Sequence, residues 1–132
     1  TLEYSISRDF NPAYEKAMGD VPVAAVSSDN HKVALEGTLL LRLDIQQIPQ
    51  LWQTIGEDFV AKIIRPTVRS RVRMVASHFE AGEIMGMRRD DVEKELKNEL
   101  ESIFYPRGIF VENVLLSDVS DISGGAKIKA AE

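Results

Sequence analysis

The segment between Ile63 and Leu116 contains two stretches of helical periodicity, one basic and one acidic, followed by a glycine and a run of strand-forming residues. In the first stretch, which begins at Pro66, apolar residues recur at the spacing of one helix face; they are Val68, Val72, Val75 and Phe79. The second begins near Arg88 and repeats the pattern with Val92, Leu96, Leu100 and Ile103. Each face must be covered by a sheet or another helix, so Val72 and Leu96, at the centres of the faces, should be buried.

The boundaries of both helices carry their own signals. Pro66 suits a first helical turn, because its missing N–H would have no partner there. Asp90 and Asp91 lie in the first turn of the second helix, where the helix dipole favours negative charge. Gly108 can adopt the left-handed conformation that ends a helix, and Ile109 to Leu116 is then predicted as a strand.

The first half of the chain is predicted to form a small sheet. Val23 to Val26 and the alternating run from Val33 to Leu43 flank the turn-forming residues 27–31 and predict a hairpin. An edge strand is expected near the N-terminus from the apolar residues Tyr4, Ile6 and Phe10. Together with the helices, this predicts an α+β fold in which a small antiparallel sheet packs against two or three amphipathic helices.

The segment between the sheet and the basic helix is less regular. Gln46 to Ile55 is predicted as a connector with one helical turn and with Trp52 packed inward. Glu57 to Ile64 is predicted as helical, and Pro66 either separates it from the basic helix or kinks a continuous one.

Five short motifs, in order, resemble the stomatin, prohibitin and flotillin family, also called the SPFH or band 7 domain. They are Arg65-Pro66, Val68 to Arg73, Ala81 to Ile84, Arg88 to Val92 and Gly108 to Leu116. Each is a common helix or strand signal, and the specificity comes from the ordered set over about half the chain. The resemblance is closest to the prohibitin-like branch.

The resemblance implies a non-enzymatic domain of a membrane-associated scaffold. In such proteins an N-terminal anchor holds the domain at the membrane surface, and a C-terminal coiled coil assembles many copies into a homo-oligomer. These assemblies organise membrane microdomains or hold and regulate membrane proteases and other integral membrane proteins. Residues 1–120 would be the globular domain, and 121–132 a flexible joint at Ser123 to Gly125 with the truncated start of the coiled coil. The Gly-Gly pair departs from the family's usual proline-led junction.

Length and composition are those of one globular domain. The chain has 132 residues, 44% of them hydrophobic and 28% charged, and a net charge of −5. It has no cysteine, which excludes disulfides and thiolate metal sites. No apolar run approaches the ~18 to 20 residues needed to span a bilayer. We therefore expect the chain as given to be soluble, and its start at Thr1, directly in a predicted strand, suggests a fragment of a longer protein.

No catalytic, cofactor or metal site is predicted. His31 and His78 are far apart in sequence, and neither belongs to a metal-binding motif. Ser77 and His78 are adjacent along a helix, so their side chains do not face each other as a nucleophile and its base must.

The basic stripe of the first helix is the candidate interaction site. It comprises Arg65, Arg69 and Arg73 beside the apolar face and Arg71 on its other side. The arginines could pair with carboxylates within the fold or across a subunit contact, for which the candidates are Glu93, Glu95, Glu99 and Glu101. They could instead contact lipid headgroups. Nucleic acid is disfavoured because no aromatic residues alternate with the arginines and the domain is acidic overall.

The alternative function is a soluble adaptor that binds an acidic partner or nucleic acid through the basic helix. About 20 apolar residues just before Thr1 in the parent sequence would favour the scaffold. Their absence, together with a second globular domain, would favour the adaptor.

Overall fold

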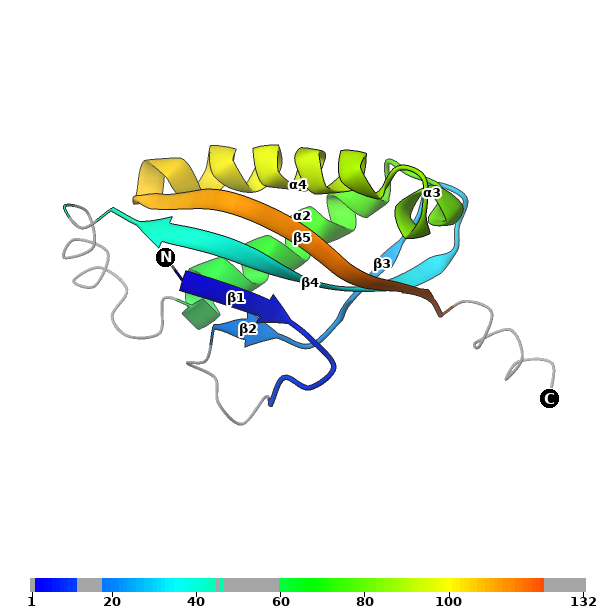
Figure 1. The fold of residues 1–132 in the computed structure, drawn as a ribbon, viewed down its shortest axis with the longest axis horizontal. Helices are drawn as coiled ribbons and strands as arrows, with labels where there is room; N and C mark the ends of the chain where they lie inside the picture. Colours follow the sequence, from blue (N-terminus) through cyan, green and yellow to red (C-terminus); the bar gives the residue numbers. More distant parts are fainter. Residues whose placement is uncertain (1, 12–17, 45, 47–59, 123–132) are drawn as a thin grey trace.

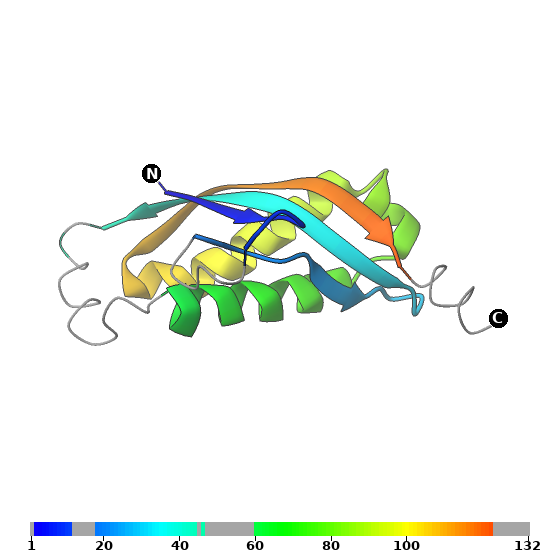
Figure 2. The ribbon, with the colours of Figure 1, turned by 90° about the horizontal axis from the view of Figure 1, so that it is seen from below.

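A computed structural model describes residues 2–11, 18–44, 46 and 60–122 (Figure 1). Its strands are β1 (Leu2–Ile6), β2 (Gly19–Asp20), β3 (Val23–Val26), β4 (Lys32–Leu43) and β5 (Ile109–Asp121). Its helices are η2 (Val60–Ile64), α2 (Arg65–Ala76), α3 (Ala81–Met85), α4 (Arg89–Phe104) and η3 (Tyr105–Arg107). Seen from below, α2 and α4 cover the same face of the sheet (Figure 2). This two-layer arrangement is the α+β fold predicted from the sequence.

The sheet is built around β4. One edge of β4 pairs along almost its whole length with β5, and the other pairs with β3 over residues 32–35 and with β1 over residues 37–41. The hairpin of β3 and β4 confirms the prediction from the alternating pattern. These three pairings are antiparallel, and the two-residue strand β2 is parallel to β1.

The core lies between the sheet and the two long helices. Val72 of α2 and Leu96 of α4 are each only 2% exposed, as their central positions in the apolar faces predicted. The inward face of β4 contributes the alternating residues Val33, Leu35, Leu39 and Leu41. A single hydrophobic core therefore contains residues from both halves of the chain.

Four sequence expectations are corrected. Phe104, which is 0% exposed, takes the inward position at the end of α4, whereas Ile103 packs against the core and is only partly buried. Phe10 lies outside β1, which ends at Ile6. Strand β5 continues past Leu116 to Asp121, since β4 supplies a partner along that whole length. The gap between the two long helices contains the short helix α3.

The predicted helix starts at Pro66 and near Arg88 are confirmed, whereas α2 ends at Ala76 and leaves the buried Phe79 in the turn beyond it. The π-helical turn η2 runs directly into α2, with Pro66 in its first turn, so the helical path is continuous. Gly108 has a φ of 81° and ends the helical segment after η3. The predicted turn with Trp52 and the C-terminal residues 123–132 lie outside the described residues. Among the described helices, none has the length and apolar character needed to cross a bilayer.

Candidate functional site

The structure places the N-terminal part of the predicted basic stripe against the small strand β2. The guanidinium of Arg69 donates two hydrogen bonds to the carboxylate of Asp20, one of them 2.7 Å long from Nη2 to Oδ1. Nε of Arg65 donates to the backbone oxygen of Gly19 at 3.0 Å. Asp20 is 2% exposed, so this carboxylate is a buried counter-charge on which two arginines converge.

The other two arginines of the stripe also have partners within the fold. Nε of Arg73 donates to the backbone oxygen of Ala24 in β3 at 3.1 Å. Arg71, on the opposite side of the helix, lies 3.8 Å from the carboxylate of Glu99 in α4. The intramolecular interpretation thus has direct geometric support, although Glu99 is the only member of the proposed acidic set that pairs with the stripe in the described part of the chain.

Two further members of the proposed acidic set, Glu95 and Glu101, have partners other than the stripe. Glu95 lies 2.7 Å from Nδ1 of His78, and Glu101 lies 3.8 Å from Nζ of Lys97 one helical turn earlier. These are partly exposed contacts, and such pairs contribute little to folding. A subunit contact through these acids remains a prediction.

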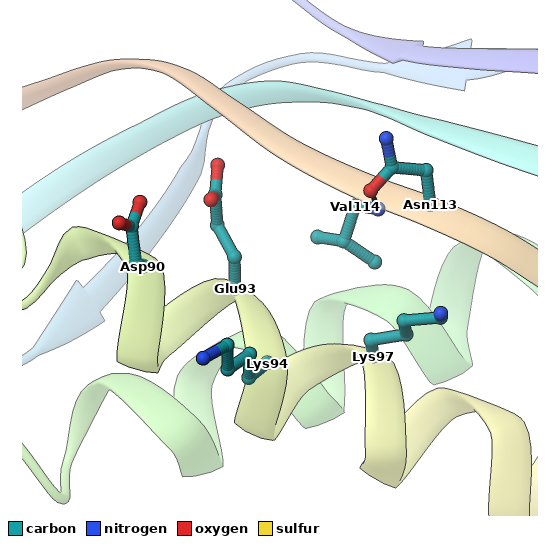
Figure 3. A pocket seen from close by; sticks show the side chains of 6 residues that line it. All are labelled: Asp90, Glu93, Lys94, Lys97, Asn113 and Val114. Atoms are coloured by element: carbon teal, nitrogen blue, oxygen red, sulfur yellow. Dashed lines mark hydrogen bonds between the residues drawn. The ribbon is translucent and has the colours of Figure 1, made fainter.

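A groove of about 230 Å³ lies between α4 and β5 (Figure 3). It is lined by Asp90, Glu93, Lys94 and Lys97 of α4 and by Asn113 and Val114 of β5. Side chains of the groove satisfy two backbone donors of β5. Glu93 accepts the N–H of Leu116 at 2.7 Å, and Asn113 Oδ1 accepts the N–H of Val114 at 2.9 Å.

Side chains that line the groove protect the outer edge of β5. Within the described residues β5 pairs with β4 alone, and an unpaired edge is a template for association with another strand. Glu93 and Asn113 already accept two backbone N–H groups of β5, which opposes pairing with another strand. This role of Glu93 could not be predicted from the sequence, because a contact between helix and strand residues 23 positions apart leaves no local pattern.

Comparison with known proteins decides the family. The family model described as "SPFH domain / Band 7 family" matches residues 4–123, which is most of the chain. This chain belongs to the SPFH domain / Band 7 family. The sequence resemblance is thereby confirmed, and the family assignment agrees with the observed α+β fold.

The curated relatives of this SPFH domain are prohibitins. Prohibitin 1 from Mus musculus and from Rattus norvegicus is 25% identical over 101 residues, and prohibitin 1 from Gallus gallus is 24% identical over the same length. The matched region covers 76% of this chain and 37% of each relative. The match is consistent with the prohibitin-like branch, and the chain spans little more than a third of those proteins.

The polar clusters of the SPFH domain connect structural elements. The carboxylate of Asp29 accepts hydrogen bonds from the hydroxyl of Ser27 and from the backbone N–H of Ala81, and these bonds hold its pKa below the ordinary value. They join the β3–β4 turn to the start of α3. In the described part of the chain, no group of three or more histidine or acidic side chains is placed to hold a metal ion.

Proposed function

We propose that this SPFH domain is a non-enzymatic module of a membrane-associated scaffold that works as a homo-oligomer. The observation that carries the proposal is the family match over residues 4–123, supported by the similarity to prohibitin 1. The resemblance extends the role to organising membrane microdomains and to holding or regulating membrane proteases or other integral membrane proteins. Each of these roles needs surfaces for binding and no reaction centre.

The fold is suited to act as a spacer. Strand β1 begins with Leu2 opposite Leu41, near one end of β4, whereas β5 ends with Asp121 opposite Val33, near the other (Figure 1). These two positions of β4 are eight residues apart, or about 27 Å at the rise of an antiparallel strand. An anchor attached before β1 and an assembly helix attached after β5 would therefore leave the domain at opposite ends.

The test uses the parent protein. We expect it to float with membranes in a density gradient, and to form a large closed assembly by light scattering when its C-terminal region is included. Residues 1–132 alone should remain a monomer or a small, concentration-dependent oligomer, because residues 126–132 are far fewer than the ~12 to 15 at which an isolated helix is even marginal. A parent protein that is monomeric and stays with the soluble fraction would contradict the proposal.

The soluble-adaptor alternative requires arginine side chains on α2 that are available to bind a partner. Arg65, Arg69 and Arg73 all donate to groups of β2 and β3, so an acidic partner or nucleic acid would have to compete with these hydrogen bonds. The same argument applies to lipid contact through this stripe. We therefore favour the scaffold, with membrane-facing groups elsewhere on the domain.

A further inference from the structure

An arginine and two aromatic rings lie against one another at the end of the sheet where β4 ends and β5 begins. Arg42 lies opposite Phe110 in the β4–β5 register, with its Cζ 4.5 Å from the centre of the phenyl ring. The ring of Tyr105 lies 5.4 Å from that of Phe110, at an angle of 60°. Tyr105 is 65% exposed, and Arg42 is exposed as well.

A second arginine lies in η3, the short helix just before β5. Arg107 is exposed and is the last residue of η3, which begins with Tyr105. We call Arg42, Tyr105, Arg107 and Phe110 the end cluster. Within the described residues, no carboxylate forms an ion pair with Arg42 or Arg107. The nearby Asp44 accepts the backbone N–H of Gln46. The end cluster thus differs from the stripe on α2, whose arginines already have partners.

The chemistry of the end cluster fits the oxygens of a phosphate group. A guanidinium presents a planar fork of donors that matches phosphate geometry, and stacking on an aromatic face orients it before any ligand arrives. The exposed phenol of Tyr105 adds a hydroxyl donor beside an apolar ring, a combination favoured where a surface is polar on one side and apolar on the other. Tyrosine and arginine are also the side chains enriched at the energetic centres of interfaces.

We propose that the end cluster binds the phosphate of anionic lipid headgroups and is the face that the domain turns toward a bilayer. The inference rests on the proposed membrane-associated function and names its contact residues. The register places Leu2 opposite Leu41, next to Arg42, so a segment preceding β1 would leave the domain beside the end cluster. The net charge of −5 opposes general adsorption to an anionic surface, so attraction to such a surface would have to come from a local group of positive charges such as this one.

The first experiment maps the face without any mutation. Vesicles of phosphatidylcholine with phosphatidylserine, carrying a spin-labelled lipid, are added to the isotope-labelled chain, and line broadening is recorded by NMR. We expect broadening at Arg42 and at residues 105–110, and little at Met87, an exposed apolar residue in the turn between α3 and α4. Broadening centred on α2 or on Met87, or none at all, would overturn the proposal.

The second experiment compares two charge-matched variants in vesicle co-sedimentation. Arg42→Gln with Arg107→Gln should weaken binding to the anionic vesicles roughly tenfold or more, because basic residues near such a surface supply much of the attraction. Lys32→Gln with Lys94→Gln removes the same charge from exposed sites outside the end cluster and should bind nearly as the wild type. Equal losses in both variants would show a net-charge effect and would overturn the proposal.

Two further outcomes are informative. One distinguishes a lipid phosphate from a free anion, and the other distinguishes failure of the end cluster from failure of the proposed function. If inorganic phosphate alone shifts the NMR signals of the end cluster and abolishes vesicle binding at low concentration, the ligand is a free anion and the bilayer assignment is wrong. If the parent protein floats with membranes while the Gln variants bind vesicles as the wild type does, the proposed function stands and the end cluster is excluded. Failure of the parent protein to float would instead remove the proposed function.

Discussion

Two hydrogen bonds join the guanidinium of Arg69 in α2 to the carboxylate of Asp20 in β2, 49 positions away in sequence, and link the helix to the strand. Asp20 is buried, whereas the side chain of Arg69 is 43% exposed. Arg65 approaches the same carboxylate at 3.9 Å. The pair explains why a strand of only two residues keeps its place at the edge of the sheet.

Removing this carboxylate should destabilise the domain markedly. We expect Asp20→Ala to lower the free energy of unfolding by roughly 2 to 4 kcal/mol, because Arg65 and Arg69 would lose a buried counter-charge and Arg69 retains partial solvation. Urea unfolding provides the measurement. Asp118→Ala is the control, since its pair with Arg8 is exposed and should be worth about 0 to 1 kcal/mol. Equal effects of the two substitutions would contradict the structural role assigned to Asp20.

The centre of the apolar face of α2 should not tolerate charge. Val72→Asp would place an unpaired carboxylate in the core, and we expect it to cost at least about 3 kcal/mol of stability or to prevent folding. Met87→Asp makes a similar change at a side chain that is 98% exposed and should leave the melting temperature nearly unchanged. A Val72→Asp protein that melts within a degree or two of the wild type would show that this face of α2 is not in the core.

Gly37 is required by the close approach of β5 to β4. A Cβ atom at this position would lie 2.3 Å from the backbone oxygen of Leu115, beside the bulge that shifts the register between Glu36 and Gly37. Gly37→Ala should therefore cost about 1 to 3 kcal/mol, as overpacking does elsewhere. Gly82→Ala is the matched control, because a Cβ atom added there would meet nothing within 4 Å outside its own stretch of helix, and α3 should be unaffected or slightly stabilised. Chemical denaturation of both variants decides the point.

Stability should fall on acidification, in part through Glu36. Hydrogen bonds from the side chain and backbone N–H of Arg8 hold the pKa of the Glu36 carboxyl below its ordinary value of 4.5. A carboxyl whose pKa is lower in the folded state stabilises the fold above its unfolded pKa, and that contribution is lost as the pH falls through the folded pKa. We expect Glu36→Gln and Arg8→Gln each to flatten the loss of stability below about pH 4.5. Unfolding curves that keep the wild-type pH dependence in both variants would rule this out.

Periodicity in the sequence determined the framework of the domain. The apolar faces with Val72 and Leu96, the stop at Gly108 and the hairpin of β3 with β4 all depend on short-range spacing or on the conformational preference of a single residue. These signals lie within a few residues of one another. They could therefore be recognised without knowing what the segments pack against, and the ordered motifs were enough to identify the SPFH family.

Tertiary structure alone decided which charges are paired. Sequence periodicity placed Arg69 beside the apolar face of α2, but nothing local indicates that Asp20, in a strand of two residues, would be its partner. In the same way, Arg42 meets Phe110 only because β4 and β5 pair in one register, with bulges that no alternating pattern predicts. The direction of a helix face is fixed by 3.6 residues per turn, whereas the partner of a long polar side chain is fixed by how distant segments pack, and that information is spread over the whole chain.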